Sequence, residues 1–381
     1  VEEDSGCHAF AGCFIRGVRN GPSPEWLRKR LTAIGLRPIS ALVDITNFFS
    51  IDQARPLHVY DAAKLNGGIT ARRGRAGERF LALNDKEYEV GLDDCVIADD
   101  ASVLGLGGVI GGEDTGVADG TTHVLLECAW FDPARIAATG RRHMINTDAR
   151  ARFERGVDAT ALEDMARAAT AMIVDLCGGE ASEVTIATAS DWPAITAPRH
   201  VPLRPDRAKS LAGIDLPMDE QAAILERLGF RQEPQGWVPP GWRPDIDGEA
   251  DLVEEIARIH GFDRVPATPL EREPGVARPT ATPAQRLERR VRRAAAARGL
   301  DEAVTWSFIA EAEAEAFGGG AWSLANPISE EMKVMRPSLL PGLIAAARRN
   351  LDRGASSIRL FEIGRRYLPD GEKPTVGILL A

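Results

Sequence analysis

Two proline-rich segments divide the 381-residue chain into three parts. The first covers residues 191–205, and the second covers residues 266–283, with prolines at Pro266, Pro269, Pro274, Pro279 and Pro283. Proline lacks a backbone N–H and keeps the residue before it out of the helical region, so neither segment continues a helix or a central strand. The sequence therefore predicts a multidomain α+β chain with domains at residues 1–195, 200–268 and 280–381.

The first part mixes short apolar runs with turn residues. We expect strands at residues 12–18, 69–72, 96–98 and 124–127. Ser23 before Pro24 predicts a capped helix, and Asp132 before Pro133 predicts another. The alanine-rich pattern of residues 159–176 predicts a long helix, so this part is a mixed α+β domain.

The middle part holds two helical patterns with a short hairpin between them. Asp219 is expected to cap a helix at residues 220–228, which Gly229 closes. A second helix lies within residues 242–266. This order indicates a small helix-turn-helix-like, winged domain, for which we favour docking on protein over DNA binding.

The third part begins with a helix that runs to Arg298. Strands are expected at residues 303–308, at residues 357–368 and over the last ten residues. Residues 335–350 read as a loop that leads into a helix. The chain stops abruptly after a strand-like run, so we expect it to be a fragment.

Composition narrows the class of protein. Hydrophobic residues make up 44% of the chain and charged residues 27%, which is typical of a globular protein. The net charge of −10 argues against broad non-specific nucleic-acid binding. No apolar run reaches the roughly 18 residues of a membrane span, and the five cysteines form no CxxC pair. We expect a cytoplasmic protein with no membrane and no DNA partner.

Residues 242–266 carry four carboxylates beside an apolar stripe. Asp251, Glu254 and Glu255 are spaced to share one face of a helix, and Asp245 precedes them. Oxygen ligands at such spacing suit Mg²⁺. A solvated acidic face is the alternative, and the spacing alone favours it.

Three other segments hold polar residues that could carry chemistry. Residues 43–61 contain Thr46, Asn47 and His58, the glycine-rich run 105–114 leads to Glu127, and residues 146–158 contain Thr147 and Ala149. Taken singly, each has an ordinary structural explanation. The glycines form neither a P-loop nor a GxGxxG helix opening.

Taken together, these segments resemble the β subunit of bacterial phenylalanyl-tRNA synthetase. The resemblance is carried by Trp242-Arg243-x-Asp245, by Asp251-Leu252-x-Glu254-Glu255-Ile256 and by Gly261-Phe262-Asp263, and it continues through MRPSLLPGL and RLFEIGRRY. It covers the whole chain, although the family is longer at both ends. Ala54-Arg55 stands where the family usually has Gly-Gln.

The resemblance implies three domains: an editing domain, the helix-turn-helix-like domain and part of a non-catalytic class II synthetase-like antiparallel-sheet domain. It implies that Asp245, Asp251, Glu254 and Glu255 bind Mg²⁺ at a site shared with an α subunit. It also implies a phenylalanine–tRNA ligase of α₂β₂ composition that uses ATP on the α subunit and acts on tRNA(Phe).

The editing domain of that family hydrolyses tyrosine wrongly esterified to tRNA(Phe). The resemblance assigns catalysis to His58, Glu127 and Thr147, and substrate binding to Thr46, Asn47, Gly111, Gly112 and Ala149. We expect Glu127 to accept the phenol proton with help from backbone N–H groups at Gly111-Gly112, because an apolar pocket alone discriminates a hydroxyl poorly. The alternatives are a scaffold for the α subunit with an idle pocket and a free-standing deacylase.

Overall fold

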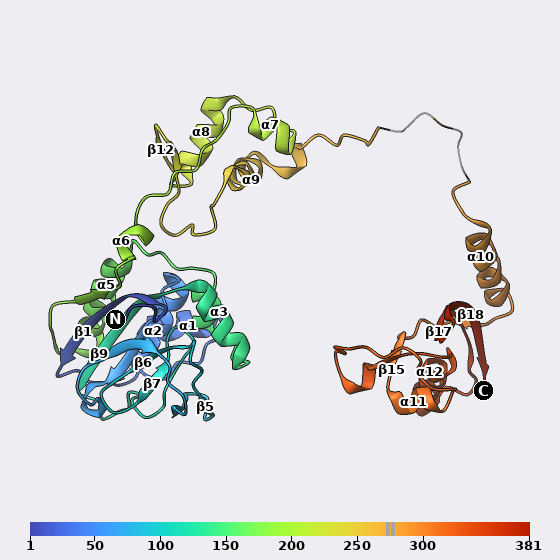
Figure 1. Cartoon of the computed structure of the whole chain (residues 1–381), viewed down its shortest axis with the longest axis horizontal. Coiled ribbons are helices and arrows are strands. Elements are labelled where there is room, and N and C mark those ends of the chain that lie inside the picture. The colour runs from blue at the N-terminus through green and yellow to red at the C-terminus, as the bar shows by residue number, and fades with distance from the viewer. Residues whose placement is uncertain (272–274, 276–278) are drawn as a thin grey trace. The chain divides into compact units, whose positions relative to one another are not determined.

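The computed structural model describes residues 1–271, residue 275 and residues 279–381 (Figure 1). Pro274 of the second proline-rich segment lies outside the described residues. The chain separates into two compact units, Val1–Pro269 and Leu270–Ala381, which we call unit 1 and unit 2. Both contain helices and small, largely antiparallel sheets, which confirms the predicted α+β class.

A five-stranded antiparallel sheet lies at the centre of the first 190 residues. Its order is β10-β1-β9-β2, and β11 also pairs with β1. The strands are β1 (Cys7–Arg16), β2 (His58–Asp61), β9 (His123–Phe131), β10 (Glu180–Ala181) and β11 (Thr185–Thr188). Side chains alternate between the faces of a strand, so this sheet, which we call the central sheet, contributes to a separate core on each side.

Helices cover one face of the central sheet. They are α1 (Glu25–Ala33), α2 (Ala41–Asp52) and α5 (Leu162–Cys177). Ile15 and Leu126 of the sheet share a buried cluster with Leu27, Ile45 and Ile173, one from each helix. The predicted long helix is present as α5, and it ends where Gly178 takes a left-handed conformation with φ of 71°.

The prediction that Ser23 caps α1 is wrong. Pro24 occupies the cap position, and its carbonyl accepts bonds from the N–H groups of Leu27 and Arg28, each at 3.1 Å. The buried Ser23 hydroxyl donates instead to Asp44 of α2 at 2.5 Å. A local capping rule cannot anticipate this bond, because its acceptor lies on the next helix.

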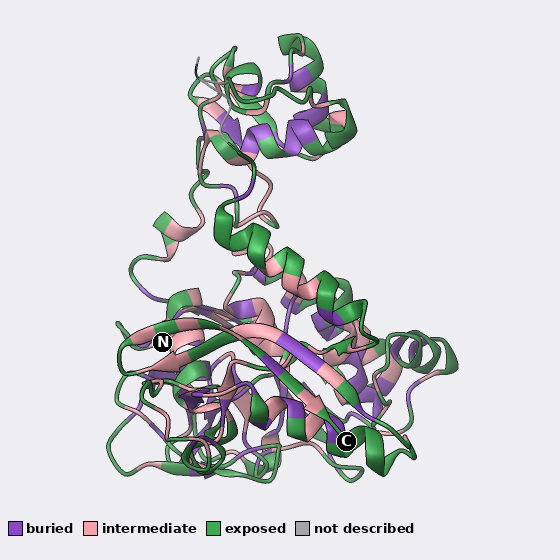
Figure 2. Cartoon of the chain, turned by 90° about the vertical axis from the view of Figure 1, so that its right-hand side faces the viewer, coloured by how far each residue is buried: buried purple, intermediate pink, exposed green. Residues whose placement is uncertain are grey.

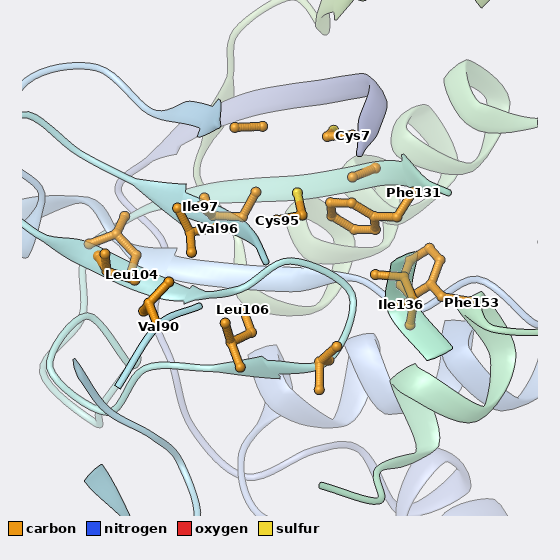
Figure 3. Close-up of a cluster of buried hydrophobic side chains, with 14 of the residues drawn as sticks. Cys7, Val90, Cys95, Val96, Ile97, Leu104, Leu106, Phe131, Ile136 and Phe153 are labelled. Carbon is orange, nitrogen blue, oxygen red and sulfur yellow. The ribbon is translucent and has the colours of Figure 1, made fainter. Parts of the chain in front are cut away.

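A four-stranded sheet of order β3-β6-β7-β8 belongs to the core on the other face, with the hairpin β4-β5 beside it. The strands are β3 (Thr70–Arg73), β4 (Arg79–Leu81), β5 (Glu87–Glu89), β6 (Cys95–Ala98), β7 (Val103–Leu106) and β8 (Ile110–Gly111). In this core, Ile97 and Leu106 belong to the same buried cluster as Phe131, Ile136 and Phe153 (Figure 3).

Short helices complete this region: η1 (Ala62–Lys64), α3 (Pro133–Arg142), α4 (Asp148–Phe153) and α6 (Trp192–Ile195). The predicted start of α3 is confirmed, since the Asp132 side chain accepts a bond from the N–H of Arg135 at 2.6 Å. Thr147 caps α4 in the same way through the N–H of Arg150. Both caps place short helices beside the four-stranded sheet.

Residues 200–268 show the predicted order of helix, hairpin and helix. The elements are α7 (Arg207–Ala212), α8 (Met218–Arg227), β12 (Arg231–Glu233), β13 (Gly236–Val238), α9 (Glu249–His260) and η2 (Phe262–Arg264). Leu225, Trp237 and Ile256 share one small core, and the helices bury one side only (Figure 2). The predicted cap at Asp219 is wrong, because Pro217 holds that position and Asp219 lies in the first turn.

Unit 2 is built around a three-stranded sheet of order β14-β17-β18. Its elements are α10 (Pro283–Ala296), β14 (Asp301–Glu302), β15 (Phe308–Ile309), α11 (Glu311–Glu315), η3 (Glu330–Met332), β16 (Val334–Met335), α12 (Leu340–Asp352), β17 (Arg359–Leu368) and β18 (Gly371–Leu380). The long pair β17-β18 is antiparallel as expected, and the short β14 adds a parallel pairing.

The prediction of one strand over residues 303–308 is wrong. Only Phe308 of this run is in a strand, and β14 ends before the run begins. The buried Glu362 explains the difference, because its carboxylate accepts bonds from the N–H and the hydroxyl of Thr305. A side chain thus satisfies backbone groups that a strand would pair with another strand.

Within the described residues, no helix is both long enough and apolar enough to cross a membrane.

Candidate functional site

A narrow cavity of about 70 Å³ opens between the central sheet and the glycine-rich turn that joins β7 to β8. His58, Tyr60 and Glu127 line it from the central sheet, Gly111 lines it from β8, and Ala149 lines it from α4. In this conformation the cavity has room for only a few water molecules. Four of the predicted editing residues, His58, Glu127, Gly111 and Ala149, therefore meet at one place, although they come from four separate elements.

Glu127 lies in the middle of β9 and is the buried acid of the cavity. Its cross-strand neighbours are His58 on β2 and Gly12 on β1, so the side chains of His58 and Glu127 project from the same face of the sheet. Gly12 carries no side chain, which keeps space beside the carboxylate. Glu127 is 7% exposed, and the partner of its side chain among the described residues is the uncharged Tyr60.

The contact of Glu127 that the sequence analysis missed is Tyr60. Tyr60 donates its hydroxyl hydrogen to Oε2 of Glu127 at 2.5 Å, and both side chains are buried. Its ring also packs edge-on against His58, with ring centroids 4.4 Å apart. The run His58-Val59-Tyr60 could have indicated this contact, since residues two apart in a strand share a face, and Tyr60 therefore lies on the same face as His58.

Burial changes the ionisation of all three groups. Burial raises the pKa of Glu127 to about 7, although the hydrogen bond from Tyr60 lowers it. Burial lowers the pKa of His58 to about 4, so the imidazole is neutral at neutral pH. The pKa of Tyr60 is raised by burial and by the charge of Glu127. An ordinary histidine pKa, which would suit a general base near neutral pH, therefore does not hold for His58 in the folded chain.

The glycine turn approaches His58 closely. A Cβ atom added at Gly111 would collide with Cε1 of the His58 ring and lie 3.1 Å from both ring nitrogens. Only glycine therefore allows this strand to pass the imidazole. The N–H of Gly112 donates to the carbonyl of Leu104 at 2.7 Å, so it is not free to bind a phenol in this conformation.

Four of the predicted residues do not line the cavity: Gly112, Thr46, Asn47 and Thr147. Thr46 and Asn47 lie on α2, where the Thr46 hydroxyl donates to the carbonyl of Val43 at 2.8 Å. Thr147 caps α4 and donates to the carbonyl of Val109 at 2.7 Å. That bond ties α4, which carries Ala149, to the glycine turn.

The loop before β2 departs from the family pattern at Ala54-Arg55. Ala54 has a φ of 50°, a left-handed conformation that favours the glycine usual in the family. Arg55 is buried, and its guanidinium donates to the carbonyl oxygens of Ala129 and Asp158. Arg55 thus anchors this loop to β9, the strand that carries the cavity residue Glu127.

The carboxylates of the acidic segment do not converge. Asp251 accepts bonds from the N–H groups of Asp247 and Gly248, at 2.9 and 2.8 Å, and so caps its own helix. Asp245 pairs with Arg243 at 2.6 Å. Glu254 is exposed on the surface of α9.

Glu255 is the buried acid of this segment, and two arginines neutralise it. Arg258 contacts it at 2.5 Å and Arg243 at 3.1 Å. Burial alone would raise the pKa of Glu255, yet these hydrogen bonds lower it. Among the described residues, no three acidic, histidine or cysteine side chains are grouped to hold a metal ion. The described residues of the acidic segment therefore do not by themselves fit a Mg²⁺ site.

Comparison with known proteins matches three family models in succession. Residues 6–178 match the B3/4 domain, residues 201–262 the tRNA synthetase B5 domain, and residues 270–380 the phenylalanyl tRNA synthetase beta chain CLM domain.

Two relatives that align with the whole chain carry the same name. The phenylalanine–tRNA ligase beta subunits of Novosphingobium aromaticivorans and Zymomonas mobilis are 56% and 51% identical, and each alignment covers 100% of this chain. The chain spans 48% of the length of each of these relatives. A solved N-terminal fragment of the phenylalanyl-tRNA synthetase beta subunit from Pyrococcus horikoshii aligns with a TM-score of 0.31 and 14% identity, over 65% of this chain and 69% of that one. With three consecutive domain matches and these full-chain identities, the chain belongs to the phenylalanine–tRNA ligase β subunit family.

Proposed function

We propose that this chain is the editing and scaffolding part of a phenylalanine–tRNA ligase β subunit, and that it hydrolyses Tyr-tRNA(Phe). The observation that carries the proposal is the cavity in which Glu127, His58, Gly111 and Ala149 meet. A buried carboxylate gives this cavity a polar group that tyrosine can satisfy and phenylalanine cannot. Such a site selects the wrong amino acid for removal.

In the proposed reaction, water attacks the carbonyl carbon of the ester and the bond to the terminal ribose oxygen breaks. The products are tyrosine and tRNA with a free ribose hydroxyl. Glu127 receives the phenol hydrogen, and the neutral His58, whose buried Nε2 has no partner among the described residues, orients the water or the amino acid. With a pKa of about 4, His58 is too weak a base to carry the proton transfer alone, so the ribose hydroxyl is the candidate for the rest.

The cavity must widen to admit a tyrosyl side chain. Ala149 is the small residue on the α4 side, and its size keeps that side open. Thr147 fixes α4 to the glycine turn, which gives it a supporting role in the proposed site, and Thr46 and Asn47 are proposed to reach the ester end of the substrate. Ala149→Trp should therefore block tyrosine release without preventing folding.

The ligase reaction, with ATP, phenylalanine and tRNA(Phe), is proposed for an α₂β₂ complex in the cytoplasm, with its chemistry on the α subunit. Asp245, Asp251, Glu254 and Glu255 are proposed to bind Mg²⁺ only together with that partner, because they do not converge within this chain. We assign no step of the editing reaction to the metal.

A scaffold with an idle pocket is the second candidate. Unit 2 supports it, because Val304, Trp306 and Ile328 are large apolar residues that are 91%, 72% and 91% exposed. Apolar exposure of this kind is typical of a surface that a partner covers.

The test is tyrosine release from preformed Tyr-tRNA(Phe), with Phe-tRNA(Phe) alongside. Glu127→Ala should abolish the preference for tyrosine, and His58→Ala should slow release. If the wild-type chain releases tyrosine no faster than buffer does, the scaffold is the better description. Equal tyrosine selectivity in wild type and Glu127→Ala would remove Glu127 from the site.

A further inference from the structure

Tyr60 lines the cavity, and the sequence analysis assigned it no role. Its side chain is 2% exposed, its hydroxyl donates to Oε2 of Glu127, and its ring contacts His58. A buried tyrosine hydroxyl needs a partner, but the partner here is the acid on which the proposed selectivity depends.

The strand register explains why these two side chains meet. His58 faces Glu127 directly across the β2-β9 pair, and Tyr60 faces Leu125. Tyr60 is therefore the diagonal neighbour of Glu127 on the same face, a separation that an aromatic side chain spans. The bond takes up Oε2 and leaves Oε1, which accepts no hydrogen bond from the described residues.

We infer that Tyr60 is a positioning residue: it holds Glu127 by one oxygen, favours the ionised carboxylate and leaves the second oxygen to receive the phenol of the substrate. The inference rests on the proposed function. It adds that selectivity for tyrosine comes from a pair of residues and not from the carboxylate alone.

The surroundings of Glu127 make this bond decisive. The titratable groups that act on it from neighbouring strands are the thiols of Cys7 on β1 and Cys95 on β6, both with raised pKa values and therefore neutral. His58 is neutral as well. The adjacent Cys128 has a raised pKa and lies near the charge of Arg55, whose guanidinium bonds to backbone oxygens.

From the remaining walls, the residues that line the cavity are glycines and apolar side chains, including Ala149 and Phe153 of α4. Among the described residues, Tyr60 is thus the hydrogen-bond donor to the Glu127 side chain. Removing it should favour the protonated acid, which accepts a phenol hydrogen poorly.

The experiment compares Tyr60→Phe with Tyr88→Phe in the full chain. Tyr88 is a matched control, because it packs against the same core and does not line the cavity. Its hydroxyl accepts a hydrogen bond from the Asn84 side chain and does not contact Glu127. The first readout is the titration of the Glu127 carboxyl carbon by NMR. In Tyr60→Phe its midpoint should rise by about one pH unit, the size expected for the loss of one hydrogen bond to an ionised group. In Tyr88→Phe it should not move.

The second readout is the ratio of tyrosine to phenylalanine release, each corrected for hydrolysis in buffer, as a function of pH. Tyr60→Phe should lose about fivefold in this ratio near pH 7 and regain most of it above about pH 8, where Glu127 ionises again. A residue that only supports the fold would lower activity without shifting the pH profile.

The possible outcomes distinguish a failure of this inference from a failure of the proposed function on which it rests. A wild-type chain without tyrosine release would overturn the proposed function. An active wild type in which Tyr60→Phe leaves both the Glu127 titration and the pH profile unchanged would overturn the inference. Faster tyrosine release by Tyr60→Phe at every pH would also overturn it, because Tyr60 would then compete with the substrate.

Discussion

The cavity and the acidic helix α9 each contain a buried carboxylate, and the pKa values of these two carboxylates are shifted in opposite directions. Glu127 is buried among neutral groups with a single neutral donor, and burial raises its pKa to about 7. Glu255 is equally shielded from solvent, yet Arg243 and Arg258 pair with it and its pKa is lowered. The two acids therefore differ in their partners, since no cation pairs with Glu127 among the described residues.

This contrast separates an acid kept for function from an acid kept for structure. A buried carboxylate without a cation costs stability, and such a cost is retained where the group must meet a ligand. A buried carboxylate between two arginines already has its partners. Glu127 is therefore the stronger functional candidate of the two, although the sequence pattern around Glu255 is the more distinctive.

The largest expected effect comes from closing the cavity at Gly111. Gly111→Ala places a methyl group against the His58 ring, so tyrosine release should fall by at least about 100-fold and stability by about 1–3 kcal/mol. Gly248→Ala, at the start of α9, is the matched control, because its Cβ would meet nothing closer than Asp251 Oδ2 at 4.0 Å.

Release assays and thermal unfolding of both glycine variants check this prediction. Comparable activity in the two would mean that the turn moves away from His58 in the active form, and the cavity geometry described here would not be the reactive one.

The next effect concerns stability and its pH dependence. Between about pH 4.5 and 7, the folded chain holds a proton on Glu127 that the unfolded chain has lost, so stability falls as the pH rises through this window. Glu127→Gln removes this loss, and at pH 8 it should be more stable than wild type by about 3 kcal/mol. Glu254→Gln, on an exposed residue, should change stability by less than about 0.5 kcal/mol.

The contribution of His58 to stability changes with pH in the opposite direction. The quantity to measure is therefore the difference in stability between the Glu127 variant and the wild type. The pKa of His58 is lowered to about 4, and its contribution to stability rises between about pH 4 and 6.5. Chemical denaturation at several pH values gives the difference directly. If Glu127→Gln gains nothing above pH 7, Glu127 is not a costly buried anion, and the comparison with Glu255 fails.

The sequence predicted local features well, because their causes are local. The helix α9 follows from apolar spacing, and the start of α3 follows from Asp132-Pro133. The family resemblance supplied Glu127, His58, Gly111 and Ala149, and the structure brings these together.

Features that depend on tertiary register were missed. The Tyr60–Glu127 bond joins residues 67 positions apart and requires the pairing of β2 with β9. The Ser23 hydroxyl donates to Asp44 on another helix, and the backbone N–H of Thr305 donates to Glu362. The capping role of Asp251 was within reach, because an acid three residues after a candidate cap, here Gly248, is a local signal.

A smaller effect on stability is expected at Arg243, which forms ion pairs with both Asp245 and Glu255. Arg243→Gln leaves Glu255 with Arg258 alone and should lower stability at pH 7 by about 1–2 kcal/mol. The loss should shrink as the pH falls below about 4.5, since paired carboxylates stabilise the fold only while ionised. Arg258→Gln should cost less, because Arg258 is more exposed and contacts only Glu255. Equal losses at every pH would show that Arg243 acts through packing and not through charge.

The smallest effect separates capping from metal binding at Asp251. Asp251→Ala should lower stability by about 1 kcal/mol in the chain alone, because the N–H groups of Asp247 and Gly248 lose their acceptor. Asp251→Asn keeps an oxygen for those donors and should recover most of the loss, but it is a poorer Mg²⁺ ligand. Thermal unfolding with and without millimolar Mg²⁺ should therefore show no metal dependence in the wild-type chain alone. If Mg²⁺ stabilises the wild-type chain but not Asp251→Asn, these carboxylates converge without a partner, and α9 is a metal site in its own right.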